Sequence, residues 1–447
     1  MTQLLITHGR LFTLGENNRY IPDGAVAVED GKIAEIGTAS KLVSKYPKAK
    51  RIDARDKLIL PGFICAHHHF YSALARGMSV PGKPPRNFLE ILKKLWWKLD
   101  AALDAKTVYY SSLVSAVDCL KHGVTTVIDH HESQNFQLGS LDEIARAVHE
   151  TGLRANLCLG VSDRYGRSKE GIKENARFLQ KLNSSHIPHP ASLVSASVGL
   201  HASFTVKDST VEDCVALARR YQAGVHTHCA EDISDQRDAM KKHRKTVVER
   251  LYKLGALGRK SILVHCVHTK DKELDIIRAT GTSVVHNPES NMNNAVGASD
   301  ILNMMRKGIR VGLGTDGMSS EMTAQARTAY LLQRHVHCDP RVAFAESANM
   351  LIQNNSRIVS ALFNQRIGVL EPGAAADIIT VDYNPPTPIS AANFIGHLMF
   401  GLPYAKVNTV MVNGKVRLKN GKCVGLDENE ILSKSREQAQ RLWSMIR

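Results

Sequence analysis

The chain has 447 residues, of which 43% are hydrophobic and 23% are charged, and this composition provides ample material for a folded core. It excludes a disordered, fibrous or disulfide-stapled protein. The net charge is +15, but the densest basic run, Lys241–Lys245, has no aromatic residues to stack on bases, so we expect no nucleic-acid partner. The eight cysteines occur singly, without a C-x-x-C pair, and are expected to be reduced.

The N-terminal segment gives an expectation about location. Met1–His8 lacks the charged stretch and apolar stretch of a secretory signal, and the chain has no uninterrupted apolar run of about 18 residues. We therefore expect a cytoplasmic protein with no membrane partner.

Short β-type runs alternate with turn signals at both ends of the chain. They are Leu4–Thr7, Leu11–Thr13, Ala25–Glu29 and Lys32–Ile36 near the N-terminus, and Asp377–Val381, Val407–Val412 and Lys415–Arg417 near the C-terminus. Asp30-Gly31 and Asn413-Gly414 are typical of hairpin turns. The pattern predicts a small β-sandwich domain built from residues 1–57 and 371–425, followed by a C-terminal helix within 426–447.

Residues 58–370 have a different pattern, in which apolar strand segments alternate with helical segments. The eight expected strands are Leu58–Cys65, Val124–Ile128, Leu153–Gly160, Leu193–Gly199, Ala223–Thr227, Ser261–His265, Ser283–His286 and Arg310–Gly314. The helical segments between them include Ala105–His122, Leu141–Thr151, Ser209–Tyr221, Lys270–Thr280 and Ser299–Lys307. Eight βα units in order predict an α/β fold, a (β/α)8 TIM barrel, with its chemistry at the carboxyl ends of the strands.

Metal-competent side chains follow several of these strands. His67 and His69 share one face of the first strand, because alternate residues do so, and such a pair forms a two-point metal clamp. His228 ends the fifth strand and Asp316 ends the eighth, where they can supply a third and a fourth ligand. Taken singly, each of these residues has a structural alternative. A histidine could be a hydrogen-bonded core residue, and the Gly-Thr-Asp-Gly segment that contains Asp316 could be a turn.

Three further side chains at strand ends are typical of proton transfer and substrate contact. Glu231, three residues after His228, can reach a bound water, and His265 ends the sixth strand facing the same centre. His201 ends the fourth strand. Asp316 is also placed to accept a proton from water. Together, the five strand ends predict one composite active site with Glu231, His265 and Asp316 as catalytic residues.

The chain resembles a known family over essentially its whole length. The motifs that carry the resemblance are Pro61-Gly62-Phe63-x-x-x-His67-x-His69, His226-x-His228-x-x-Glu231, His265-Cys266-Val267-His268, Val285-His286-Asn287-Pro288 and Gly312-x-Gly314-Thr315-Asp316-Gly317. They are similar to the deaminase and chlorohydrolase branch of the amidohydrolase superfamily. Further motifs, such as Leu95–Asp100 and Ser290–Asn294, are similar to the SsnA group of aminohydrolases, which is associated with selenium-dependent purine metabolism.

The resemblance implies roles for the residues already named. His67, His69, His228 and Asp316 would bind one divalent metal per subunit, with zinc as the expected metal and iron as the alternative. Glu231 would carry a proton from water to a ring nitrogen. His265 would orient and polarise the hydroxide, and His201 would contact the substrate. The fourth strand contains no lysine, which within this family favours a single metal. A homodimer is also implied.

Three more residues are candidates for substrate contact, each with a structural alternative. His131 follows the second strand and could instead hydrogen-bond behind the site. Arg76 could bind an oxo group or simply form an ion pair, and Asn287 could touch the ligand or cap its loop.

The sequence and the resemblance together predict a metal-dependent aminohydrolase. Its substrate would be a small molecule, a purine-like, pterin-like or other N-heteroaromatic amine, whose C–N bond is hydrolysed by metal-activated water. The alternatives are hydrolysis of a cyclic amide, hydrolysis of a C–Cl or C–S bond in a heterocycle, and a barrel without catalysis.

Overall fold

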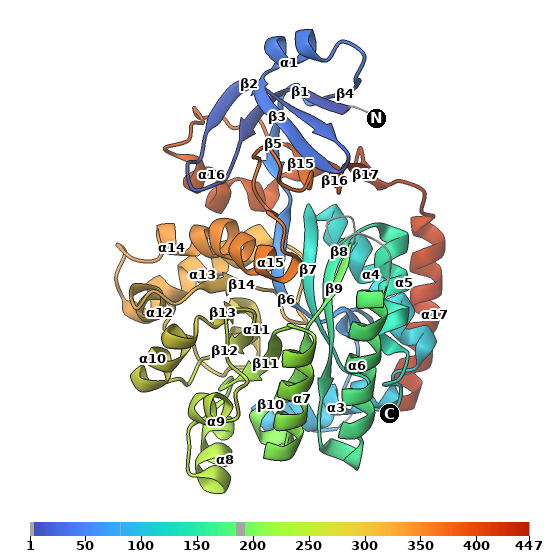
Figure 1. The fold of residues 1–447 in the computed structure, drawn as a ribbon, viewed down its shortest axis with the longest axis vertical. Coiled ribbons are helices and arrows are strands. Elements are labelled where there is room, and N and C mark those ends of the chain that lie inside the picture. The colour runs from blue at the N-terminus through green and yellow to red at the C-terminus, as the bar shows by residue number, and fades with distance from the viewer. Residues whose placement is uncertain (1–3, 81, 185–192, 447) are drawn as a thin grey trace.

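The computed structural model describes residues 4–80, 82–184 and 193–446, which form a parallel barrel and a separate sheet from both termini (Figure 1). The eight barrel strands are β6 (Phe63–His68), β7 (Val124–His131), β8 (Arg154–Val161), β10 (Val198–Ala202), β11 (Val225–Cys229), β12 (Ile262–His265), β13 (Ser283–His286) and β14 (Val311–Leu313). They pair in that order, and β9 (Val194–Ala196) also pairs with β8. A bridge between His68 and Asp316 joins the two ends of the series, so the predicted barrel fold is confirmed.

Helices surround the barrel and match the predicted segments within two residues. They include α4 (Ala105–Lys121), α5 (Ser140–Thr151), α6 (Ser168–Ser184), α7 (Asp208–Arg220), α8 (Ile233–His243), α9 (Val247–Lys253), α10 (Asp271–Thr280), α12 (Ile301–Arg306), α13 (Met322–His337), α14 (Phe344–Asn349) and α15 (Asn355–Phe363). In α5, Leu141, Ile144 and Val148 recur at helical spacing and are buried against the barrel. The helix ends at Gly152, whose φ of 69° is readily adopted only by a residue without a side chain.

The terminal strands form one mixed sheet. Its members are β1 (Leu4–Phe12), β2 (Tyr20–Glu29), β3 (Lys32–Thr38), β4 (Lys50–Asp53), β5 (Lys57–Pro61), β15 (Ile378–Asp382), β16 (Lys406–Val412), β17 (Lys415–Lys419) and β18 (Lys422–Cys423). The pairs Glu29–Lys32 and Val412–Lys415 close the two predicted hairpins. The N-terminal and C-terminal strands meet where β5 pairs with β15, as expected for a small domain built from both termini.

The predicted strand Leu58–Cys65 is wrong in one respect, because it is two strands in two different sheets. β5 belongs to the terminal sheet, and β6 opens the barrel. Gly62 separates them, and a Cβ at this position would lie 2.1 Å from the Thr125 side chain, so only glycine allows the close passage. The domain limits stay predictions, and this pairing favours a first limit after Pro61. Residues 1–3, 81, 185–192 and 447 of the predicted domains lie outside the described residues.

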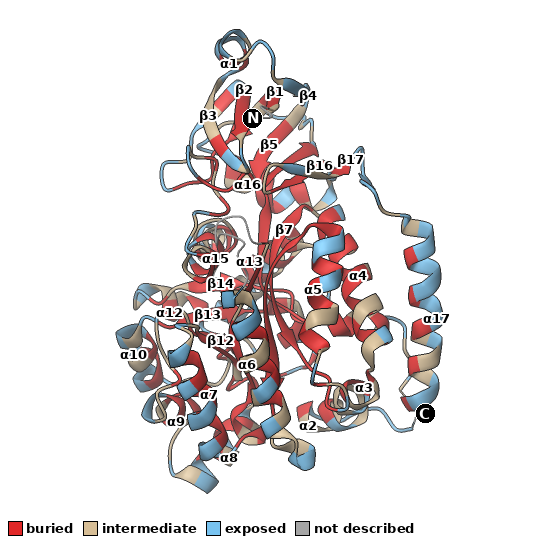
Figure 2. Cartoon of the chain, turned by 45° about the vertical axis from the view of Figure 1, so that its right-hand side comes forward, coloured by how far each residue is buried: buried red, intermediate tan, exposed pale blue. Residues whose placement is uncertain are grey.

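The predicted C-terminal helix is α17 (Glu428–Ile446), which packs along α4 and α3 (Trp97–Ala102) on the outside of the barrel (Figure 2). Its buried side chains include Ile431 and Leu442. Among the described residues, no helix has both the length and the apolar character needed to cross a membrane.

An apolar cluster fills one end of the barrel. Ile64, Val264 and Val285 of the strands pack there with Ile358 and Phe363 of α15. Because this end is closed by hydrocarbon, polar side chains that point inward can gather only at the carboxyl ends of the strands.

A buried ion pair joins the barrel to the terminal sheet and provides a stability test. Nε of Arg154 lies 2.9 Å from Oδ2 of Asp377, and Nη2 lies 3.1 Å from Oδ1. Removing one partner leaves a buried charge, so we expect Asp377→Ala to lower the free energy of unfolding by about 3–5 kcal/mol in urea titrations. The control is Asp382→Ala. The exposed carboxylate of Asp382 lies 3.4 Å from Nζ of the half-buried Lys57, and its removal should change the free energy of unfolding by less than about 1 kcal/mol. Equal losses in the two variants would contradict this account.

Candidate active site

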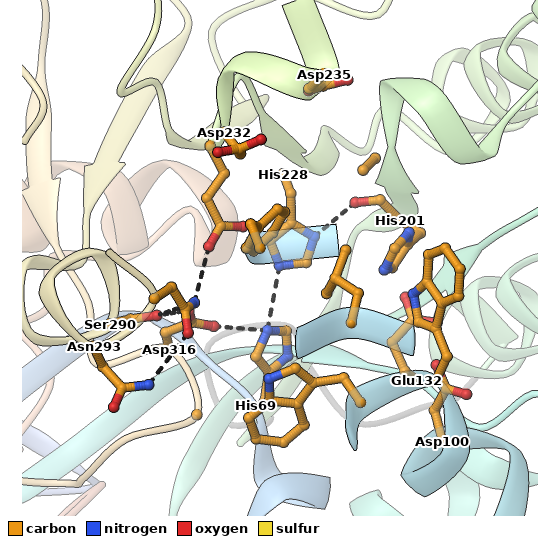
Figure 3. Close-up of a pocket in the computed structure, with 18 of the residues that line it drawn as sticks. His69, Asp100, Glu132, His201, His228, Asp232, Asp235, Ser290, Asn293 and Asp316 are labelled. Carbon is orange, nitrogen blue, oxygen red and sulfur yellow. Dashed lines mark hydrogen bonds and ion pairs between the residues drawn. The ribbon is translucent and has the colours of Figure 1, made fainter. Parts of the chain in front are cut away.

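Four histidines and one aspartate converge at the carboxyl ends of β6, β11, β12 and β14. Ligand atoms of His67, His228, His265 and Asp316 all lie within 4.8 Å of one another. Nε2 of His69 lies 2.9 Å from Oδ1 of Asp316 and 3.2 Å from Nε2 of His228 (Figure 3). The structure therefore brings together all four residues that were predicted as metal ligands.

The donor atoms of this cluster fit a divalent metal. Nε2 of His67 and Nε2 of His265 are buried and have no hydrogen-bond partner, and the former lies 3.3 Å from Oδ1 of Asp316. Buried ring nitrogens without partners are costly, and a cation among them would remove that cost. Three imidazoles and a carboxylate form a set that both zinc and iron accept.

Outer contacts hold two of the rings in the orientation that metal binding requires. Nδ1 of His69 donates to the backbone carbonyl oxygen of His130 at 2.5 Å, and Nδ1 of His228 donates to that of His201 at 2.6 Å. A ring that donates from Nδ1 presents the lone pair of Nε2 toward the cluster. One atom each of His69, His130 and His228 also lie within 4.8 Å of one another, so His130 borders the metal position.

The charge states of the cluster suit a metal and a proton carrier. Burial lowers the pKa of His67 to about 3, so this ring is neutral. For His69, burial opposes protonation, but contact with Asp316 outweighs it and raises the pKa to about 9, so a metal and a proton compete for this ring. Burial, followed by the charge of Asp316, raises the pKa of Glu231 well above its usual value. Glu231 is thus able to hold a proton near neutral pH.

The short helix α11 (Pro288–Asn293) and the residue after it contact the side chains predicted to move protons. Nδ1 of His265 donates to Oδ1 of Asn291 at 2.8 Å, and Nδ2 of Asn294 donates to Oε1 of Glu231 at 3.2 Å. Nε2 of His265 in turn lies 3.4 Å from Oε2 of Glu231. One turn of helix thereby fixes the position of both groups.

Backbone strain is concentrated at the same strand ends. His265 has a φ of 72° and Asp316 has a φ of 55°, a left-handed region that costs non-glycine residues about 1–3 kcal/mol each. Oγ of Ser290 donates to Oδ2 of Asp316 at 2.5 Å, which holds the carboxylate toward the histidines. Such strain persists where surrounding contacts impose it, as they do here.

The cluster opens into a pocket with about 800 Å³ of space, part of which is open to solvent. Apolar side chains form much of its wall, namely Tyr71, Phe88, Leu92, Trp96, Trp97, Phe204 and Met318. Polar groups line the remainder, among them Asp100, Glu132, His201, Glu231, Asn293 and Asn294. An apolar cleft with a few convergent polar groups is typical of a small-molecule site.

Of the residues predicted to contact the substrate, some line the pocket and others do not. His201 lines the pocket, with its Nδ1 2.8 Å from Oγ1 of Thr205. His131 is buried outside the lining, with its Nε2 2.8 Å from Oγ of Ser133. Glu132, the next residue, lines the pocket instead.

Arg76 and Asn287 do not reach this pocket. The Arg76 side chain is 71% exposed, and its Nη2 lies 3.6 Å from Oδ2 of Asp118. Asn287 is fully buried beside Gly314, where an added Cβ would lie 2.4 Å from its Oδ1. For Arg76, the ion-pair alternative fits better than substrate contact. Asn287 precedes α11, but its side chain makes no capping hydrogen bond, so the structure supports neither the loop cap nor substrate contact.

Sequence reasoning missed Asp100 and Arg164 as members of the site. Nη2 of Arg164 lies 2.9 Å from Oδ2 of Asp100 and 3.3 Å from Oε2 of Glu132, beside the pocket. Arg164 follows directly on the third barrel strand, and that position is the signal that could have identified it.

Comparison with known proteins decides the family. The model of the Amidohydrolase family matches residues 58–417, and a short match to an imidazolonepropionase-like composite domain of bacteria covers residues 24–49. This chain belongs to the amidohydrolase family. The amidohydrolase is 30% identical to a 5-methylthioadenosine/S-adenosylhomocysteine deaminase of Syntrophomonas wolfei subsp. wolfei, over 98% of this chain and 99% of the relative.

Two further proteins agree with this assignment. A 5′-deoxyadenosine deaminase of Methanopyrus kandleri is 30% identical, over 95% of this amidohydrolase and 96% of the relative. The crystal structure of an adenosine deaminase from Xanthomonas campestris with bound zinc superposes with a TM-score of 0.86 at 23% identity, over 99% of each chain. The predicted superfamily is confirmed, and the closer similarity to the SsnA group stays a prediction.

Asn291 offers a test of how this amidohydrolase orients its catalytic histidine. Asn291→Ala removes the acceptor for Nδ1 of His265, so we expect kcat to fall about tenfold or more while the metal content is unchanged. The control is Met292→Ala, whose side chain is exposed on the same helix and which should leave kcat within about twofold. Steady-state kinetics and metal analysis give both readouts. A normal kcat in Asn291→Ala would show that the contact is not required.

Proposed function

We propose that this amidohydrolase hydrolyses the C–N bond of an N-heteroaromatic amine and releases ammonia. The observation that carries the proposal is the position of Glu231 and His265 directly beside His67, His228 and Asp316, in a cluster of which Glu231, His228 and Asp316 line the pocket. A bound divalent metal would lower the pKa of a water molecule toward neutrality.

The side chains then divide the proton transfers among them. Glu231 takes a proton from the attacking water and delivers it to a ring nitrogen, which makes the neighbouring amine-bearing carbon electrophilic. Asp316 accepts the second proton of the water, and this proton leaves with the amine as ammonia. His265 is held by Asn291 so that its Nε2 faces both carboxyl groups and orients the attacking oxygen. The carbon gains an oxygen and loses nitrogen, without a redox change.

The aromatic lining of the pocket supports a planar substrate. Phe88, Trp96 and Phe204 provide aromatic and apolar contacts for a ring, and His201 is placed to contact it. The named relatives act on adenine-containing molecules, so among the purine-like, pterin-like and other amines, an adenine-type amine is the first to test. This is a proposal about substrate class and does not select one compound.

The proposal includes one zinc ion per subunit, held by His67, His69, His228 and Asp316. The donor set and the zinc in the Xanthomonas campestris structure support it. A homodimer, which the family resemblance implies, and a cytoplasmic location, which the sequence predicts, remain predictions.

Glu231→Gln tests the reaction directly. The amide keeps the shape of the side chain but cannot carry the proton, so we expect ammonia release to fall by about 10²-fold or more while metal is retained. The assay is ammonia release from adenosine, 5′-methylthioadenosine, guanine, isoguanine, 8-oxoguanine and a pterin amine. Asp238→Asn, which breaks a surface contact with Lys242, is the control and should keep full activity. Silence of the wild-type protein on the whole panel, or undiminished release by Glu231→Gln, would refute the proposal.

A further inference from the structure

A buried charged cluster lies against the pocket wall and has no part in the proposed proton transfers. The guanidinium of Arg164 contacts Asp100 at 2.9 Å and Glu132 at 3.3 Å, and the exposed fractions of these side chains are 9%, 2% and 2%. The same guanidinium lies 4.9 Å from the ring centre of Trp97. In Figure 3, Asp100 and Glu132 appear on the opposite side of His69 from Asp316 and Ser290.

The cluster leaves several polar atoms without a partner. Oε1 of Glu132, Nη1 of Arg164 and Nε1 of Trp97 are all buried and make no hydrogen bond. Gly160 lies against Oε1 of Glu132, where a Cβ would be only 1.9 Å away, so the neighbouring strand supplies no side-chain donor. Oδ1 of Asp100 is unpaired as well, so two acceptors and two donors lack a partner, which indicates that a ligand completes the set.

A purely structural ion pair in the same protein looks different. In the contact between Arg154 and Asp377, both carboxylate oxygens are used, and Oδ1 also accepts from the backbone N–H of Asn413 at 2.7 Å. Arg154 is the first residue of β8, whereas the site lies at the carboxyl ends of the barrel strands. Glu132 uses only Oε2, which accepts from Arg164 and from Gln134.

A single side chain, His130, separates the cluster from the metal position. Oε1 of Glu132 lies 3.9 Å from Nδ1 of His130, and the ring of His130 lies 4.7 Å from the ring of His228. A heterocycle whose amine is held at the metal would therefore direct another of its edges or substituents toward Glu132 and Trp97, both of which line the pocket.

We propose that Glu132, Arg164 and Trp97 form a binding subsite for an uncharged group that carries a hydrogen-bond donor beside an acceptor. Two carboxylates flank the single guanidinium and both already contact it, so the cluster disfavours an anion and offers its unpaired donors and acceptors to an uncharged group. Two sources share this chemistry: the adjacent hydroxyl groups of a ribose and the N–H and C=O edge of an oxidised base. The inference rests on the proposed function for the placement of the reacting amine.

The test measures binding rather than turnover. Metal-loaded, full-length protein carrying Glu231→Gln, which prevents conversion, is titrated calorimetrically with two matched ligand pairs: adenosine against 2′,3′-dideoxyadenosine, and 8-oxoadenine against adenine. We expect the first member of one pair to bind at least about tenfold more tightly than the second, which corresponds to about 1.4 kcal/mol. The pair that shows the preference identifies the source of the group.

Variants of the subsite should remove that preference. Glu132→Gln removes the charge of an acceptor, and Trp97→Phe removes a donor. Each variant is expected to reduce the ratio of affinities within the ligand pair below about threefold, with unchanged metal content. The matched control is Arg167→Gln, because Arg167 forms a surface ion pair with Glu170 three residues further along and should keep the preference. Glu132→Gln removes a buried charge and could disturb folding. Trp97→Phe leaves all charges in place, so it tests the subsite even if Glu132→Gln does not fold.

The possible results separate the two proposals. Absence of any preference in the parent protein, or a preference that persists in both subsite variants, would overturn the subsite. Absence of ammonia release by the wild-type protein, together with a preference that the variants abolish, would overturn the deaminase reaction and leave the subsite standing.

Discussion

The contact of Asp316 with the rings of His67 and His69 is the interaction on which the site and the barrel both depend. It joins the first barrel strand to the residue that follows the last, beside the bridge that closes the series at His68. Because one end of the barrel is filled with hydrocarbon, the polar side chains of this cluster can be satisfied only at the mouth. A divalent metal would link all of them at once, so metal binding and barrel closure are coupled.

Hydrogen bonds from surrounding residues fix the orientation of the side chains near this contact. Backbone carbonyl groups orient His69 and His228, while Asn291 and Asn294 of the loop after β13 hold His265 and Glu231. The strained backbone at two strand ends is maintained by these contacts. Catalytic groups that are fixed before substrate binds need little reorganisation during reaction. The opposite wall, with Glu132 and Arg164, remains polar and incompletely paired, as a recognition surface would be.

Much of this arrangement could be predicted from the sequence because a parallel barrel fixes where strand ends meet. Period-two alternation correctly separated His67 and His69 from His68, whose ring instead contacts Thr315 and Ser115. The strand over 58–65 was mispredicted, since apolar character alone does not reveal that Gly62 passes the chain from one sheet to another. The far wall was missed because Asp100 lies on α3 and Arg164 lies three residues beyond the end of β8, so neither is among the strand-end residues from which the site was predicted.

The most direct test of the central claim is to titrate metal into metal-free protein and to follow ammonia release from its best substrate. If the cluster around Asp316 is the reaction centre, activity should be absent without metal and should rise linearly until about one zinc ion is bound per chain. Full activity in verified metal-free protein, or tight binding of metal without any effect on activity, would contradict this account.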